Sequence, residues 1–214
     1  MEGYTKRKLR RTPPAGAVIL VRGRDNNPFM KFVRFGIRFF SDRENMDSAI
    51  DHAVMHWGKM GEAPVKFYDE IVEANITGVE RQSLRRYIND RDGLLVFYNE
   101  NIEKPTKWAL VKAACYGRVG RPYDLIEGVF SFVKKYFGIK GKNDPGKNFC
   151  SEVVVESFEC GNIKTSNLPA GETSPTDLKK FFLSEKGKKA GWKLIDYQNV
   201  GTEFFDKYRL KPIA

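Results

Sequence analysis

The chain has 214 residues, of which 41% are hydrophobic and 30% charged, as in ordinary soluble globular proteins. This length allows one domain with a substantial core of its own, so neither a disulfide framework nor a long disordered chain is expected. The net charge of +10 comes without an RRM, zinc-finger or helix-turn-helix signature, so we expect no specific nucleic-acid partner.

The N-terminal region is basic and lacks an apolar export segment. Residues 1–12, with the run Lys6 to Arg11, predict a basic flexible tail, and residues 13–214 a single domain. We favour a solvated tail, and the alternative is peripheral contact with an anionic surface. Ala15 to Val21 is too short for a signal peptide or a membrane span. We therefore expect a cytoplasmic protein, or one exported without a cleaved signal peptide.

Short apolar runs and helical spacing predict a mixed fold. The predicted strands cover residues 17–21, 52–58, 65–74, 93–98 and 192–195. The predicted helices cover residues 29–40, 104–116, 123–137, 149–159 and 178–183. Asn148 is the expected N-cap of helix 149–159, and Ser174 or Thr176 that of helix 178–183. Several closely spaced strands followed by helices favour an antiparallel sheet and the α+β class.

The helix at 29–40 is aromatic on one side and basic on the other, and it lies in a long insert at 26–48. We favour an amphipathic helix that packs on the core. Contact with a membrane or an acyl chain is the alternative.

Only two histidines exist, His52 and His56, so an imidazole base must be one of them. A zincin would need Glu directly after the first histidine, where the chain has Ala53. No third ligand with metal-like spacing follows, so we expect no metal and no other cofactor.

Cys150 lies at the start of the helix at 149–159. There, unpaired backbone N–H groups and the helix dipole favour a thiolate, and the same groups can hold an oxyanion. A small buried apolar role is the alternative. Cys115, on an apolar helical face, and Cys160, at a helix C-terminus, are expected to be structural. Cys160 is about 15 Å from Cys150 along the helix, too far for a disulfide.

Glu73 ends the predicted strand 65–74. If that strand pairs beside the strand of His52, the carboxylate can orient the imidazole. A surface glutamate is the alternative, and the local pattern does not decide between them.

Five segments follow one another in an order that a known family shares. They are Asp51 to Gly58, Val72 to Val79, Gly120 to Asp124, Phe149 to Val154, and Ser174 to Leu178. From about residue 14 to 196, the chain resembles the circularly permuted NlpC-type papain-like cysteine hydrolases, in their YiiX-like branch. In that family the histidine strand precedes the nucleophile helix.

The resemblance implies a permuted papain-like fold, in which an antiparallel sheet or barrel packs against helices and the nucleophile lies at a helix N-terminus. It implies a catalytic triad of Cys150, His52 and Glu73, with His52 preferred to the second histidine. Tyr123 and Ser151 are expected to take part in oxyanion or substrate binding.

The expected activity is that of a thiol hydrolase resembling peptidases and amidases, which cleaves an amide or ester bond through a thioester. The expected substrate is peptide-like or an acyl lipid. The alternatives are a lipid-directed acyltransferase or phospholipase-like enzyme, and a non-catalytic binding module on the same fold.

Overall fold

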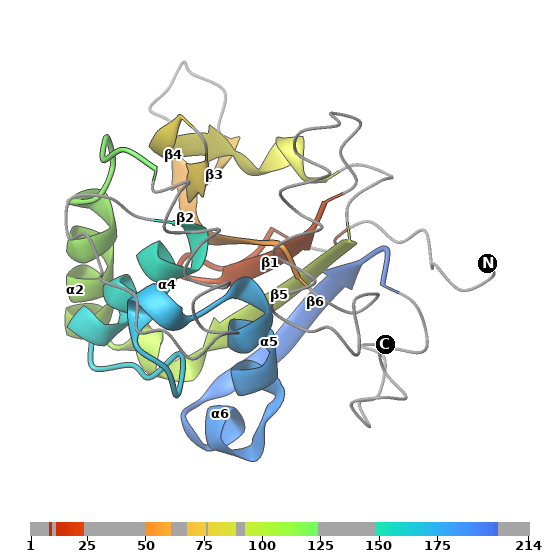
Figure 1. The fold of residues 1–214 in the computed structure, drawn as a ribbon, viewed down its shortest axis with the longest axis vertical. Coiled ribbons are helices and arrows are strands. Elements are labelled where there is room, and N and C mark those ends of the chain that lie inside the picture. Colours follow the sequence, from red (N-terminus) through yellow and green to blue (C-terminus); the bar gives the residue numbers. More distant parts are fainter. Residues whose placement is uncertain are drawn as a thin grey trace.

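Figure 1 shows a computed structural model of the protein, which describes Leu9 and residues 12–23, 50–60, 68–75, 77–88, 93–123 and 149–200. The strands of this part of the chain form one antiparallel sheet in the order β4-β3-β2-β1-β5-β6. They are β1 (Val18–Arg22), β2 (His52–Met60), β3 (Tyr68–Asn75), β4 (Gly78–Ser83), β5 (Gly93–Asn99) and β6 (Trp192–Gln198).

Strand β1 lies inside the sheet between β2 and β5, and its apolar run is buried on both faces. Val18 pairs with Met55 of β2 and with Phe97 of β5, and all three side chains belong to the larger hydrophobic cluster. Ile19 points to the opposite face, into a second cluster. Burial on both faces explains why the β1 sequence is continuously apolar and does not alternate.

The helices cover the face of the larger cluster (Figure 1). They are α2 (Pro105–Tyr116), α4 (Cys150–Cys160), α5 (Pro175–Leu183) and the short α6 (Glu185–Lys189), with 3₁₀ helices η2 (Leu84–Arg86), η3 (Glu100–Glu103) and η4 (Ala170–Glu172). Helix α4 packs against β2 and against α2. At its end, a Cβ on Gly161 would lie 2.6 Å from Cγ2 of Val111, so the α2–α4 contact requires glycine there.

An aromatic cluster joins two helices to the far edge of the sheet. The rings of Phe182 in α5 and Trp192 in β6 stack with centroids 4.0 Å apart. Phe158 of α4 lies 5.1 Å from Trp192, and Phe97 of β5 lies 5.1 Å from Phe182. These contacts fix α4 and α5 on the sheet.

The α+β class, the antiparallel sheet and the five strands that the sequence predicts are confirmed. The predicted helices at 104–116, 149–159 and 178–183 also occur, and Ser174 is the N-cap of α5, accepting a 3.0 Å hydrogen bond from the N–H of Asp177. The expected N-cap of α4 was wrong, because the helix begins at Cys150 and its N-cap is Phe149, not Asn148.

Sequence patterns missed β4, η2 and α6. Strand β4 is an edge strand with only two buried residues, so it lacks the apolar alternation of a half-buried strand. The α6 sequence, EKGKK, is short and has no apolar stripe.

Some predicted features lie outside the described residues. These are the insert at 26–48 with its helix at 29–40, nearly all of the helix at 123–137, and most of the basic tail. Two residues of the tail range are described. Leu9 packs against the second cluster, and the Thr12 hydroxyl donates a 3.1 Å hydrogen bond to Asp69.

Every helix among the described residues is too short or too polar to cross a lipid bilayer.

Candidate active site

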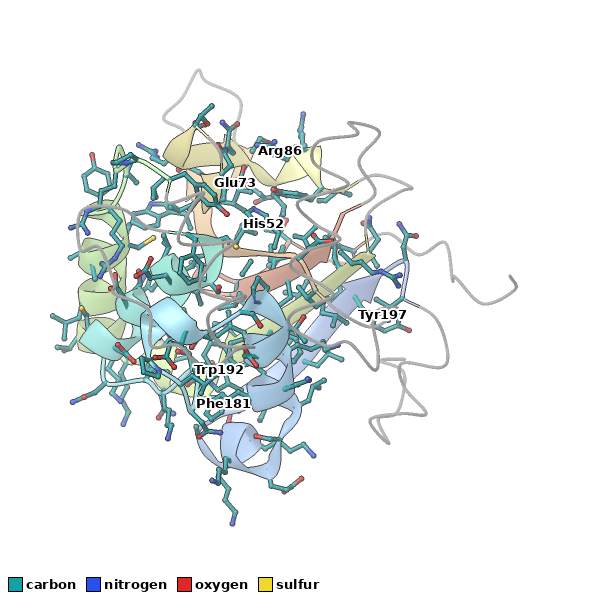
Figure 2. All side chains as sticks on the ribbon, viewed as in Figure 1. His52, Glu73, Arg86, Phe181, Trp192 and Tyr197 are labelled. Carbon is teal, nitrogen blue, oxygen red and sulfur yellow. The ribbon has the colours of Figure 1, made fainter. Side chains whose placement is uncertain are left out.

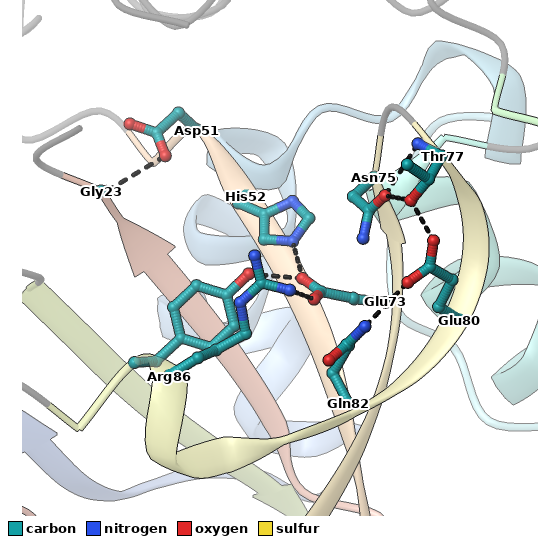
Figure 3. A network of polar contacts seen from close by, with 10 residues as sticks. Gly23, Asp51, His52, Glu73, Asn75, Thr77, Glu80, Gln82 and Arg86 are labelled. Carbon is teal, nitrogen blue, oxygen red and sulfur yellow. Dashed lines mark hydrogen bonds and ion pairs between the residues drawn. The ribbon is translucent and has the colours of Figure 1, made fainter. Parts of the chain in front are cut away.

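Two neighbouring strands bring His52 and Glu73 together. Strands β2 and β3 are antiparallel, and their register places Glu73 opposite Val54. His52 lies two residues before Val54 on the same face, so the two side chains are diagonal neighbours. His52 Nε2 lies 2.7 Å from Glu73 Oε2 (Figure 3). The strand of Glu73 thus pairs beside the strand of His52, as the predicted role of the carboxylate required.

Cys150 is the first residue of α4 and is nearly buried, with 4% of its surface exposed. The N–H of Phe149 donates to the carboxylate of Glu152 at 3.2 Å, which satisfies the backbone donor of the N-cap residue. The N–H groups of Cys150 and Ser151 belong to the first turn, where a helix supplies no acceptor. The helix start therefore offers donors and a positive dipole end beside the sulfur.

The side chain of Cys150 lies beside the imidazole of His52, near enough for its charge and a hydrogen bond to raise the pKa of the ring. Because Nε2 of the ring faces Glu73, Nδ1 is the nitrogen left for the sulfur. Side chains from α4, β2 and β3 therefore form one continuous series: thiol, imidazole, carboxylate. This is the arrangement in which a base activates a nucleophile and a third group orients the base.

The charges of these groups reinforce each other. Burial by itself lowers the pKa of His52, but the negative charge and hydrogen bond of Cys150, with those of Glu73, raise it to about 10. Burial would raise the pKa of Glu73, yet hydrogen bonds from His52 and Tyr87 and the nearby Arg86 charge lower it to about 2. Both shifts favour the charged forms, a protonated ring and an ionised carboxylate.

Glu73 has two further partners that sequence reasoning missed. The Arg86 guanidinium donates to Oε1 at 2.5 Å, and the Tyr87 hydroxyl donates to Oε2 (Figure 3). Both residues lie at the end of η2, in a stretch that the sequence marks only as arginine-rich. A buried carboxylate needs a nearby positive charge, so the expectation of a buried Glu73 could have prompted a search for an arginine partner.

The start of β2 is held by α5. The Thr176 hydroxyl accepts from the N–H of Ile50 at 2.9 Å and donates to its carbonyl at 3.0 Å. Next along the chain, Asp51 accepts from the N–H of Gly23 at 3.2 Å (Figure 3). The Ser-Pro-Thr-Asp segment at 174–177 thereby fixes the backbone just before His52.

Of the two predicted binding residues, Ser151 is fully buried and its hydroxyl donates to the carbonyl of Thr173 at 2.6 Å. That side chain fastens α4 to the loop before α5, so its backbone N–H is the group available to an oxyanion. Tyr123 is half-buried and packs against the same hydrophobic cluster as Cys150.

The remaining histidine and cysteines lie apart from this series. His56 is buried, with Nδ1 3.0 Å from the carbonyl of Pro14, and burial lowers its pKa. Cys115 is buried in α2, and burial raises the pKa of its thiol to about 12. Cys160 is exposed at the far end of α4. Within the described ranges, no three His, Cys, Asp or Glu side chains are grouped as metal ligands would be.

Comparison with known proteins identifies the family. Residues 12–200 match the family model described as permuted papain-like amidase enzyme, YaeF/YiiX. No curated protein matches the chain. Among solved structures, the chain is similar to the metalloprotein YiiX from Escherichia coli O157:H7, at 16% identity and a TM-score of 0.48, over 90% of this chain and 91% of that one.

Proposed function

We propose a specific reaction from the premise that this chain belongs to the family of permuted papain-like amidases, which are thiol hydrolases. The reaction is hydrolysis of an amide bond in a peptide-like substrate, through a thioester on Cys150. The single observation that carries this proposal is the continuous series of Cys150, His52 and Glu73.

In the first step, the Cys150 thiolate attacks the carbonyl carbon of the substrate, and the carbonyl oxygen becomes an oxyanion. Backbone N–H groups of Cys150 and Ser151 at the start of α4 stabilise it. The protonated His52 then gives its proton to the leaving nitrogen, and the C–N bond breaks. The products of this step are a free amine and an acyl group bound to the sulfur.

In the second step, the now neutral His52 takes a proton from water, and the hydroxide attacks the thioester carbonyl. The C–S bond breaks, the acid leaves, and the thiolate and imidazolium are restored. Throughout, Glu73 keeps the ring oriented and stabilises its positive charge. Tyr123, half-buried against the same cluster as Cys150, is proposed to contribute to substrate binding at the edge of the site.

The test begins with the nucleophile. The full chain is treated with iodoacetamide at pH 6, and the alkylation rate of each cysteine is measured by peptide mass spectrometry. We expect Cys150 to react faster than Cys160, although Cys160 is exposed and Cys150 is not. Equal or slower reaction of Cys150 would contradict its role as nucleophile.

Turnover is then measured with fluorogenic peptide amides. Cys150→Ala should lower kcat/KM by about a thousand-fold or more, because it removes the attacking atom. The matched control, Cys160→Ala, should leave it unchanged.

The alternatives are separated by the fate of the acyl group. A labelled thioester on Cys150 is trapped and offered either water or an added amine or alcohol. Preferred transfer to the acceptor indicates an acyltransferase, and release of fatty acid from phospholipid vesicles a lipid-directed enzyme. If no acyl group is ever found on Cys150, the non-catalytic module is favoured.

A further inference from the structure

Arg86 and Tyr87 hold the far side of the Glu73 carboxylate. The carboxylate is completely buried, and each of its oxygens has a charged or polar donor. Oε1 accepts from Arg86, and Oε2 accepts from both His52 and Tyr87. A carboxylate with donors on both oxygens can neither rotate nor turn away from the imidazole without breaking a hydrogen bond.

The segment that carries these donors is itself anchored. Leu84, at the start of η2, and Tyr87, just after it, are buried in the second hydrophobic cluster. The Tyr87 carbonyl accepts from the side chain of Gln198 at 3.3 Å. The guanidinium of Arg86 lies 5.4 Å from the centre of the Tyr87 ring. The buried Leu84 and Tyr87 therefore fix the direction of the Arg86 side chain, which is itself 47% exposed.

We propose that Arg86 and Tyr87 are positioning residues, which keep Glu73 ionised and fixed and thereby hold the His52 ring against Cys150. This inference rests on the proposed function for its effect on turnover. The hold on Glu73 can be measured without any substrate.

The charged and titratable groups around Glu73 define what each variant changes. His52 faces it from β2, and Glu80 lies directly opposite it in the register of β4. Arg86 and Tyr87 face it from the end of η2. Glu80 brings a like charge, so the Arg86 charge is needed to offset the Glu73 carboxylate when His52 is neutral.

The chain offers a matched control for each variant. Arg85 is the adjacent arginine in η2, is exposed, and makes no contact with Glu73 within the described residues, so Arg85→Gln removes the same charge nearby. Tyr98→Phe removes a half-buried hydroxyl on β5 as the control for Tyr87→Phe. Arg86→Lys keeps the charge and tests rescue.

The first measurement is a carbon-13 NMR titration of the Glu73 carboxyl in the full chain. Arg86→Gln should move its midpoint up by about 1 pH unit or more, because an opposite charge is lost next to a buried carboxylate. Tyr87→Phe should move it in the same direction, and Arg86→Lys should stay close to the wild type. If Arg86→Gln shifts the midpoint no more than Arg85→Gln, the inference is wrong.

The second measurement is the alkylation rate of Cys150 from pH 7 down to pH 3, or to the lowest pH at which both proteins stay folded. In Arg86→Gln the rate relative to wild type should fall by about 2-fold toward pH 3, where a growing fraction of neutral Glu73 no longer holds the ring. A loss that is the same at every pH would indicate a merely structural role and overturn the inference. The two proposals fail in different ways. Slow alkylation of Cys150 in the wild type contradicts the proposed function. The NMR midpoints of the Glu73 carboxyl test, without any substrate, whether Arg86 and Tyr87 hold that carboxylate.

Discussion

Glu73 shows how a single buried side chain can depend on its neighbours for its charge. Burial favours the neutral acid, and only the hydrogen bonds and charges of surrounding groups keep its pKa low. Figure 2 shows the labelled Glu73, His52 and Arg86 gathered at one end of the molecule. Interactions that set an ionisation state in the folded protein also contribute to its stability.

That link gives a prediction for acid unfolding. The pKa of Glu73 is about 2 in the folded protein, against 4.5 for an ordinary glutamate. The unfolded chain therefore binds the proton first, so this stabilisation is present above pH 4.5 and is lost as pH falls toward 2. The loss should be about 2–3 kcal/mol of unfolding free energy.

Urea unfolding between pH 7 and pH 2.5 measures it. Glu73→Gln should be less stable at neutral pH and should show a flatter pH dependence than the wild type. The control, Glu185→Gln, changes an exposed carboxylate and should leave the profile as it is. Parallel profiles for Glu73→Gln and wild type would count against the assignment.

A histidine and Cys150 could be proposed as candidate site residues because the chain offers few of each, whereas the choice of His52 and the role of Glu73 came from the resemblance to a known family. It has two histidines and three cysteines, and only Cys150 lies at a helix start. Arg86 and Tyr87 were not predictable, because their contact with Glu73 depends on a 3₁₀ turn at the end of an edge strand. Nothing in an arginine-rich sequence says which guanidinium turns inward.

At the scale of elements, α5 acts as a clamp on the start of β2. Its first turn is capped by Ser174, and that places Thr176 against the backbone of Ile50, two residues before His52. A helix that supplies no catalytic candidate thus fixes where the histidine strand begins.

Thr176→Val should therefore affect both stability and reactivity. It removes two hydrogen bonds to the backbone while keeping the side-chain volume, and should cost about 1–2 kcal/mol in urea unfolding. Alkylation of Cys150 should also slow, because the start of β2 positions His52. Thr106→Val, at an exposed position in α2, is the control. Lost stability with unchanged alkylation would show that the clamp does not position the imidazole.

Elements with a strong apolar pattern could be predicted and those without one could not. Strand β1 and helix α4 bury most of their residues, so their sequences carry a clear signal. Strand β4 and helix α6 are held by their neighbours and not by an apolar face of their own, so tertiary context decides them.

At the scale of the whole molecule, the His52–Glu73 pair and the aromatic cluster lie apart. Figure 2 places the labelled His52 and Glu73 well apart from Phe181 and Trp192. The strand order that separates them, with β5 next to β1, did not follow from the periodicity of the sequence.

This separation predicts that stability and reactivity can be changed independently. Phe182→Leu loosens the stack on Trp192 and should lower the unfolding free energy by about 1–2 kcal/mol. At a temperature where the variant is folded, the alkylation rate of Cys150 should change little, because the Thr176 hydrogen bonds to Ile50, and not the aromatic stack, set the start of β2. A changed rate would show that the two regions are coupled.

The order of the site residues along the chain has a consequence for biosynthesis. His52 and Glu73 are 21 residues apart on adjacent strands, whereas Cys150 arrives much later, on α4. A ribosome releases the chain from its N-terminus, so the histidine and carboxylate are made well before the thiol. The nascent protein therefore carries a base without a nucleophile. On the proposed function, the reactive centre therefore forms only after α4 has docked on the sheet.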